Sequence, residues 1–285
     1  MLDSSDTFVT LYANLCDVPP IDCRWVAGFA RGRWNELDST NLVGAELARV
    51  VDRNKEDRKI ERWAIRADHQ SGGLGQHGRS WTDVAGRDLC LSAVLTGGLQ
   101  TETAWMLNMK VCLALADVVE QLIDESGASG DVQVKWPNDL FVGGRKISGV
   151  LIETTWRGKE MASAVVGMGL NMGGQPPYPN ATSLEAAGLG CLKVDVVEQL
   201  VLEALAARLD RTDGPAALIA AYNAKLFGQG QAQRWMLDGE EVRGVLDHID
   251  IEGRMWLKGD RRAYVPGEAS WLGFEPDCSR RISQT

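Results

Sequence analysis

Cysteine and histidine are scarce in this chain, and their spacing excludes common metal sites. The 285 residues contain six cysteines and three histidines. No two cysteines form a C-x-x-C pair, and so few histidines leave the sequence without a ligand set for structural zinc. We therefore expect reduced thiols in a protein of the cytosol.

Positive charge and long apolar runs are also in short supply. The chain has 30 lysines and arginines against 39 aspartates and glutamates, a formal net charge of -9. Because nucleic-acid binding depends on clustered cations, we expect no DNA binding. No apolar run approaches the ~20 residues of a membrane-spanning helix, and the N-terminus does not resemble a signal peptide. We therefore expect a cytoplasmic protein with no membrane partner.

Several catalytic signatures are missing as well. There is no G-x-S-x-G sequence, no cysteine tied by its context to a histidine, and no recognisable acid/base pair of carboxylates. The run Gly-Gly-Arg-Lys at 143–146 lacks the spacing of a phosphate-binding P-loop. Residues 73–78 match G-x-G-x-x-G, but a dinucleotide fingerprint must open a helix, and residues 79–87 are rich in turns. A mobile loop that contacts an anion with its backbone, or a merely flexible surface loop, fits better.

What the sequence does contain is a series of strand and helix patterns. The expected strands are 33–38, 63–67, 89–95, 132–136, 139–142, 146–153 and 161–171, and the expected helices are 42–54, 103–123, 194–211 and 215–226. From residue 231 onward, short strands alternate with turns, as in a small all-β barrel. We expect an α+β fold with a mixed sheet packed on helices, and a boundary near residues 227–230.

The most informative stretch is residues 135–153, KWPNDLFVGGRKISGVLIE. Gly143 and Gly144 form a two-residue turn that tolerates positive φ, so the flanking strands make a hairpin. Lys146 then lies just past the turn and faces back toward Asp139. These two residues are either a solvated cross-strand charge pair, which contributes little, or part of a functional site.

With its flanks, this stretch resembles the signature of biotin protein ligases, adenylate-forming enzymes that attach biotin to a lysine of a carrier domain. The run KWPND at 135–139, followed by Lys146 and Gly149, carries the resemblance. Residues 37–41 are similar to the biotin-contacting strand end, 70–81 to the glycine-rich adenylate loop, 167–171 to the adenine-contacting segment and 231–271 to the C-terminal barrel. The likeness covers about residues 34–272.

The resemblance implies a class II synthetase-like biotin/lipoate ligase core over residues 1–229 and an SH3-like barrel over 230–285. It implies ATP-dependent ligation of biotin, through biotinyl-5′-AMP, to a lysine of a biotin carboxyl carrier protein domain, with Mg²⁺ on the phosphates. Some relatives carry an N-terminal winged helix-turn-helix and act as repressors, but the prefix here is too short and uncharged for one. A homodimer is left open.

The resemblance also carries roles to individual residues. Lys146 would offset charge where the carboxylate meets the phosphate, and Asp139 would orient or deprotonate the carrier lysine. The implied biotin contacts are Ser39, Thr40, Asn41, Gln70, Gly73, Leu74, Gly75, Trp81 and Lys146. The implied ATP or adenylate contacts are Gln76, Arg79, Lys135, Asn138 and Asn171. No metal ligand is assigned.

Residue chemistry fits these roles, with one departure. Hydroxyls and a side-chain amide can pair with a neutral ureido ring, in which each unpaired group would cost ~1–3 kcal/mol. The family's loop, however, reads G-R-G-R-x-G-R, and Leu74 and Gln76 stand at the inner arginines. A leakier ligase, a compensated one, and a non-catalytic biotin-binding paralogue all remain open. Lipoate or octanoate transfer is a lesser alternative because its R-R-x-S-G-G-G loop is absent.

Overall fold

The structure is a computed structural model that describes residues 11–12, 15, 18–53, 61–97, 99, 103–211 and 213–274. Its strands are β1 (Asp22–Val26), β2 (Phe29–Trp34), β3 (Arg62–Ala67), β4 (Leu89–Leu95), β5 (Val132–Lys135), β6 (Asp139–Val142), β7 (Arg145–Arg157), β8 (Glu160–Leu170), β9 (Ala232–Leu237), β10 (Glu240–Ile249), β11 (Met255–Leu257) and β12 (Ala269–Phe274). The helices are α2 (Thr40–Arg53), α3 (Ala104–Ser126), α4 (Val194–Asp210) and α5 (Pro215–Ala224), with single turns η2 (Gln76–Gly78) and η3 (Glu185–Leu189).

The first eight strands form one mixed sheet in the order β1-β2-β3-β4-β8-β7-β6-β5. β2 and β3 are parallel, and β4, β8 and β7 are antiparallel neighbours in its centre. This confirms the expected mixed sheet. The β1–β2 hairpin was not expected, because residues 1–30 gave no clear pattern.

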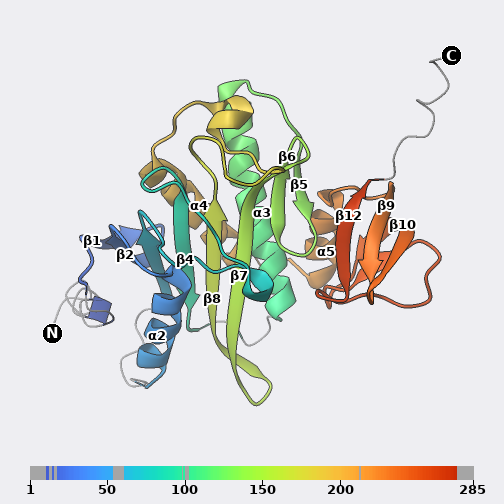
Figure 1. Ribbon diagram of the computed structural model, residues 1–285. Helices are drawn as coiled ribbons and strands as arrows, with labels where there is room; N and C mark the ends of the chain where they lie inside the picture. The colour runs from blue at the N-terminus through green and yellow to red at the C-terminus, as the bar shows by residue number, and fades with distance from the viewer. Residues whose placement is uncertain are drawn as a thin grey trace.

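Helices cover the two faces of this sheet differently. α3 and α4 lie behind it, and α2 lies in front of β4 and β8 (Figure 1). Alternation along the strands explains this: on β8, Ala164, Val166 and Met168 join the core under α3, whereas Val165 packs with the α2 residues. The front face beyond α2 carries Gly167 and Gly169, which lack side chains and so let other residues pack directly on the sheet.

α3 has clear end signals on both sides. Thr103 caps its N-terminus by accepting a hydrogen bond from the Met106 N–H at 3.1 Å, and Gly127 ends it in the left-handed region at φ 69°. Its middle is buried almost all round, as expected for a helix between a sheet and two other helices. No helix in the described ranges is long and apolar enough to cross a membrane.

The predicted hairpin is confirmed and belongs to a three-stranded meander of β5, β6 and β7. Gly143 and Gly144 form its turn at φ 55° and 76°. In the register, Lys135 faces Asp139, Asp139 faces Gly149 and Phe141 faces Lys146. Paired residues of antiparallel strands share a face, so all five lie on the front of the sheet.

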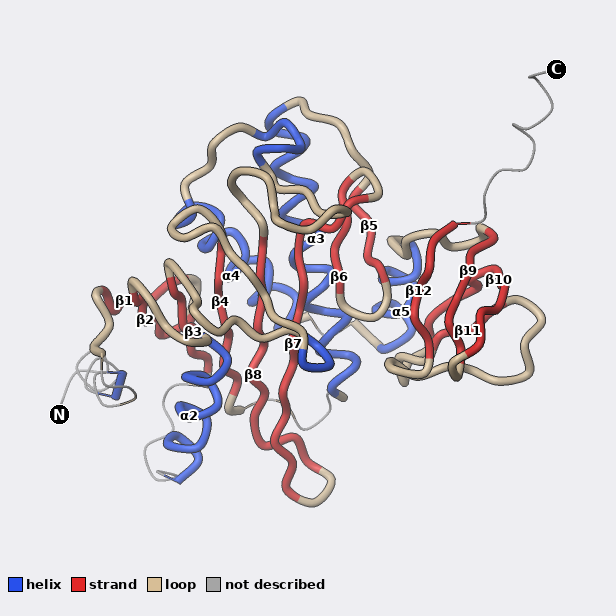
Figure 2. Tube along the Cα trace, viewed as in Figure 1, coloured by secondary structure: helices blue, strands red, loops and turns tan. Residues whose placement is uncertain are grey.

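The C-terminal strands form a four-stranded antiparallel sheet in the order β11-β10-β9-β12, beside β5, β6 and α5 (Figure 2). We call residues 230–274 the C-terminal module. Closure into an SH3-like barrel and the domain boundary stay predictions. The chain at the expected boundary is held by hydrogen bonds, since the Gly230 N–H donates to Leu246 O at 2.9 Å and Gln233 Nε2 donates to Gly228 O at 2.6 Å.

Candidate active site

A cavity of about 890 Å³ opens on the front face of the large sheet. Its walls come from the start of α2, the loop between β3 and β4, the β5–β7 meander, the segment after β8, and the C-terminal module. All the sequence-predicted site residues except Gly73 line it. Its volume lies in the upper part of the range of small-ligand sites, about 300–1,000 Å³.

One end of the cavity is polar and neutral. Gln70 Oε1 accepts hydrogen bonds from the Thr40 N–H at 2.8 Å and the Thr40 hydroxyl at 3.1 Å. The Ser92 hydroxyl lies 2.7 Å from Thr40 Oγ1, and Ser39 is 1% exposed at the same helix start. The Thr40 and Ser92 hydroxyls and the Gln70 amide are held by one another, so this end can pair with a neutral polar ligand.

Asn41 is used differently from its neighbours. Its Nδ2 donates to Glu153 at 2.8 Å, and its Oδ1 accepts from Ser92 at 2.6 Å. Gly167 allows this packing, because a Cβ there would stand 2.3 Å from Asn41 Oδ1. Asn41 therefore joins α2 to β4 and β7, and its predicted contact with biotin stays a prediction.

The Trp81 indole forms a wall over a pair of glycines. Gly149 of β7 and Gly169 of β8 are register partners. An added Cβ at Gly169 would lie 2.3 Å from Trp81 Cε2, and one at Gly149 would lie 3.3 Å from Trp81 Cζ3. Trp136, the other candidate wall, instead donates its indole N–H to Gly253 O at 2.9 Å in the C-terminal module.

The loop after β3 crosses in front of β7 and β8 and is folded on itself (Figure 1). The Trp81 N–H donates to Gly73 O at 2.9 Å, and the Gly75 N–H donates to Arg79 O at 2.8 Å. A Cβ at Gly73 would stand 2.4 Å from Trp81 O. Gly73 therefore allows the loop to fold tightly and is not itself part of the lining, and its predicted contact with biotin stays a prediction.

The other end of the cavity is cationic. Lys146 Nζ lies 2.6 Å from Asp139 Oδ1, and both side chains are partly exposed, at 35% and 18%. Within the described chain, Asp139 is the one carboxylate in the lining, against Arg79, Lys135 and Lys146. Burial lowers the pKa of Lys135, and nearby Lys146 and Arg79 lower it further against the opposing effect of Asp139.

Two asparagines stand at the edge of the cationic end. Asn138 Nδ2 donates to Val150 O, and Asn171 Nδ2 donates to Thr182 O at 3.1 Å. Asp88, which sequence reasoning missed, accepts from the N–H groups of Met172 and Gly173 at 2.8 and 3.1 Å. It thereby fixes the segment that follows Asn171, while burial raises the pKa of its carboxyl group.

Sequence reasoning missed other residues of the lining. It also missed Ser92, which is not itself part of the lining but whose hydroxyl contacts Thr40 and Asn41, because Ser92 sits on a strand that reads as uniformly buried. Tyr178 and Asn180 follow β8 in an irregular segment, and Trp271 comes from β12 of the C-terminal module. Only the tertiary fold brings these to the cavity, so no local signal could have identified them.

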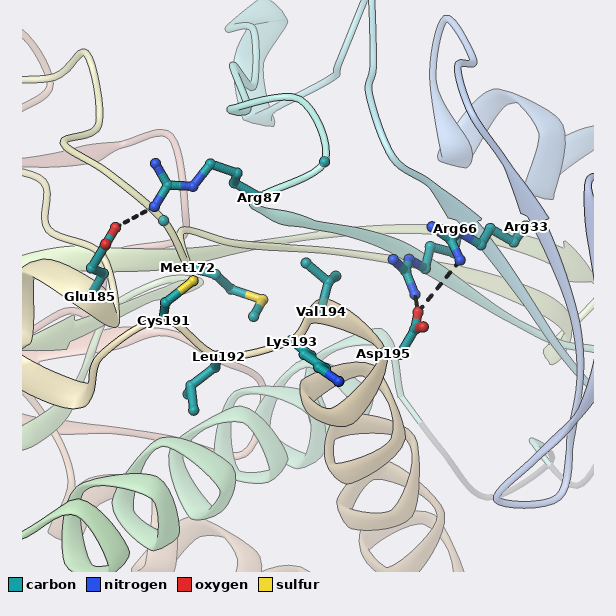
Figure 3. Close-up of a pocket in the computed structure, with 12 residues that line it drawn as sticks. Arg33, Arg66, Arg87, Met172, Glu185, Cys191, Leu192, Lys193, Val194 and Asp195 are labelled. Carbon is teal, nitrogen blue, oxygen red and sulfur yellow. Dashed lines mark hydrogen bonds and ion pairs between the residues drawn. The ribbon is translucent and has the colours of Figure 1, made fainter.

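A second cavity of about 290 Å³ lies beside the start of α4 (Figure 3). Arg33 and Arg66 both point toward Asp195, and Arg87 pairs with Glu185 at 2.6 Å. Because these cations already have carboxylate partners, we assign this cavity a structural role. No group of three or more His, Cys, Asp or Glu side chains in the described ranges could hold a metal ion.

Comparisons with known proteins agree with this geometry. The sequence profile of the Biotin/lipoate A/B protein ligase family matches residues 46–171. The chain is 31% identical to the biotin–acetyl-CoA-carboxylase ligase of Mycobacterium tuberculosis, covering 87% of this chain and 93% of that protein. It is 30% identical to the ligase of the same name from Paracoccus denitrificans, covering 83% and 98%.

A solved structure shares the fold. The biotin protein ligase of Aquifex aeolicus, in complex with biotin and ATP, superposes with a TM-score of 0.66 at 22% identity, covering 85% of this chain and 98% of that one. The structural likeness at 22% identity shows the fold alone. The sequence relatives, which match over nearly their whole length, show the family. The chain belongs to the biotin protein ligases of the biotin/lipoate A/B protein ligase family.

Proposed function

We propose that this protein ligates biotin to a specific lysine of a biotin carboxyl carrier protein domain, using ATP and passing through biotinyl-5′-AMP. The observation that carries the proposal is one cavity with two chemically different ends. The two ends adjoin at Lys146, whose Nζ lies 6.0 Å from the centroid of the Trp81 ring. Biotinyl-AMP has the same division, a neutral bicyclic ring at one end and a phosphate ester at the other.

The neutral end suits the ureido group of biotin. That group offers one carbonyl acceptor and two N–H donors, and the Ser39 and Thr40 hydroxyls with the Gln70 amide supply both polarities without a charge. Leaving one of these groups unpaired would cost about 1–3 kcal/mol, which favours a ligand that satisfies them all. The Trp81 ring then covers the apolar part of the ligand.

The cationic end suits the first chemical step. The biotin carboxylate attacks the α-phosphorus of ATP, a new C–O–P linkage forms, the bond to the β-phosphate breaks, and pyrophosphate leaves. Two anions must meet, so cations are needed where negative charge builds up. We assign Lys146 to that role and Arg79 and Lys135 to the leaving phosphates, because these three cations line this end of the cavity.

In the second step, the ε-amine of the carrier lysine attacks the carbonyl carbon of the anhydride. The amide bond forms, the C–O bond to the phosphate breaks, and AMP leaves. A lysine is mostly ammonium at neutral pH, so it must lose a proton first. Asp139 is the carboxylate in the lining that can orient the ammonium group or accept its proton.

The donor set fits Mg²⁺ held mainly by the substrate. Mg²⁺ prefers oxygen ligands and is commonly bound through phosphates, waters and one or two carboxylates. Asp139 with the Asn138 side chain could provide such oxygens, although Lys146 already engages Asp139 at 2.6 Å. A bound Mg²⁺ would neutralise phosphate charge.

We infer a cytoplasmic location from the free thiols of Cys23, Cys90, Cys112 and Cys191, and a homodimer stays a prediction.

One assay tests the proposed function directly. Purified protein is incubated with ATP, MgCl₂, biotin and a carrier domain, and pyrophosphate release and carrier mass are followed. We expect stoichiometric pyrophosphate and a single biotin added to one lysine. The matched control uses a carrier in which that lysine is replaced by arginine. Pyrophosphate release without carrier modification would limit the protein to adenylation. The absence of both pyrophosphate and modified carrier would contradict ligation.

A second candidate is a non-catalytic protein that binds biotin or its adenylate. The neutral side chains of Leu74 and Gln76 in the loop favour it, because the family's loop carries arginines at these two positions. This candidate predicts tight biotin binding by calorimetry with no pyrophosphate release at any ATP concentration.

A further inference from the structure

Lys135 occupies an unusual position for a cation. Its Nζ lies 5.6 Å from the ring centroid of Phe141 and 5.2 Å from that of Trp271. Within the described residues, its ammonium group has no hydrogen-bond or ion-pair partner, because Asp139 is engaged by Lys146. Desolvating a charge without a partner is costly, so an anion in the cavity would complete this environment.

The two rings come from different parts of the chain. Phe141 belongs to β6, in the same meander as Lys135, whereas Trp271 belongs to β12 of the C-terminal module. Phe227 links them, with its ring centroid 4.9 Å from that of Phe141 and 5.6 Å from that of Trp271. The position of the Lys135 ammonium group therefore depends on the docking of the C-terminal module.

That docking is well defined in the structure. Trp136, the residue after Lys135, donates to Gly253 O at 2.9 Å. Asn223 of α5 donates to Ile249 O and accepts from the Ile249 N–H, both at 2.8 Å. The module is thus held next to the KWPND segment by directional bonds, and it brings Trp271 to Lys135.

We propose that Trp271 is a positioning residue for adenylation, which holds the Lys135 ammonium group against the phosphates of ATP. This deepens the proposed function, on which it rests, by extending the nucleotide site into the C-terminal module. The Trp271 indole N–H has no hydrogen-bond partner among the described residues. The effect of Trp271 comes from the ring face, which attracts the cation and excludes water.

The proposal predicts a selective loss of nucleotide affinity. Calorimetry with α,β-methylene-ATP at saturating biotin measures binding without turnover. Trp271→Ala should weaken nucleotide binding roughly five- to thirtyfold and leave the Kd for biotin within twofold. Trp271→Phe should restore most of the affinity, because a ring without the N–H suffices. Leu272→Ala is the matched control, an exposed neighbour on β12 outside the cavity.

A double-mutant cycle tests whether Trp271 acts through Lys135. In a Lys135→Gln background, Trp271→Ala should cause no further loss of nucleotide affinity, because the cation that it positions is gone. Burial lowers the pKa of Lys135, so the wild-type Kd should rise at alkaline pH as the lysine loses its proton. Trp271→Ala exposes the ammonium group to water and should move this rise to higher pH. The charged groups nearby are Asp139, Lys146 and Arg79.

The outcomes separate the two proposals. Unchanged nucleotide affinity in Trp271→Ala would overturn the role of Trp271, and so would an equal loss from Trp271→Ala in the wild-type and Lys135→Gln backgrounds. Parallel losses of biotin affinity and thermal stability would overturn it too, since they indicate a merely structural role. If the wild type releases no pyrophosphate but the coupling is found, the ligase function fails while the positioning role stands.

Discussion

The pair of glycines beneath Trp81 gives the sharpest test of the site. Gly169→Ala adds one methyl group whose carbon would stand 2.3, 2.5 and 2.7 Å from three atoms of the Trp81 ring. Ordinary carbon contacts are about 3.5–4.0 Å, so the ring must move by roughly 1 Å or more. β8 cannot yield easily, because it is paired on both sides with β4 and β7.

We expect the change to weaken biotin binding more than it disturbs the fold. Overpacking a well-packed site costs ~1–3 kcal/mol, which corresponds to a Kd for biotin raised roughly 5- to 150-fold. Calorimetry with biotin alone measures this without ATP. Gly214→Ala is the control, because a Cβ at Gly214 would meet nothing within 4 Å and its φ is -65°.

A second background isolates the cause. In Trp81→Ala, the ring is absent, so adding Gly169→Ala should change stability by no more than about 0.5 kcal/mol in urea unfolding. The reasoning fails if Gly169→Ala alone retains the wild-type Kd for biotin. It also fails if Gly169→Ala lowers the free energy of unfolding by the same amount in the wild-type and Trp81→Ala backgrounds.

Three further predictions concern single side chains. Lys146→Ala should lower the rate of pyrophosphate release about 10²–10³-fold and change biotin affinity much less; unchanged release would refute its role. Gln76→Arg should reduce free biotinyl-AMP and non-specific lysine labelling roughly tenfold, because charged donors bind more strongly than neutral ones; equal release from both proteins would contradict this. A hydrogen bond from the His69 ring to the Asp83 carboxylate raises the pKa of His69. The pair therefore stabilises the fold fully below the ordinary pKa of about 6.5 and loses that contribution as pH rises through the raised value. The difference in unfolding free energy between wild type and His69→Gln should therefore be larger at pH 5.5 than at pH 9; a constant difference would exclude the pairing.

The cationic centre of the site could be predicted because it is local. Asp139 and Lys146 lie on neighbouring strands joined by Gly143 and Gly144, so the turn alone predicts that they lie close together. The register shift between Leu140 and Phe141, which pairs Asp139 with Gly149, is not encoded by the turn. Trp271 is different. Its contact with Lys135 depends on the docking of two parts of the chain that lie far apart in the sequence, and no short-range pattern encodes that docking.

The missed β1–β2 hairpin has a more specific cause. Its two-residue turn is Ala27–Gly28, at φ 49° and 81°. Such turns normally place Asn, Asp or Gly at the first position, because the left-handed region costs other residues roughly 1–2 kcal/mol. Here the five paired residues on each side hold the alanine in that conformation. Tertiary pairing overrides the local preference, so the sequence signal for the turn is absent.

The loop with Leu74 and Gln76 now has a physical interpretation. The bonds from Trp81 to Gly73 and from Gly75 to Arg79 are between backbone atoms, so neutral side chains at 74 and 76 do not prevent the loop from folding. Their effect is on charge, because the cations left at the cavity are those of Arg79, Lys135 and Lys146. Lys146 and Lys135 lie on the sheet, and we propose that they serve the first step. The missing positive charges at positions 74 and 76 should therefore weaken retention of the finished adenylate rather than slow its formation. Gln76→Arg tests this by restoring one of the two charges.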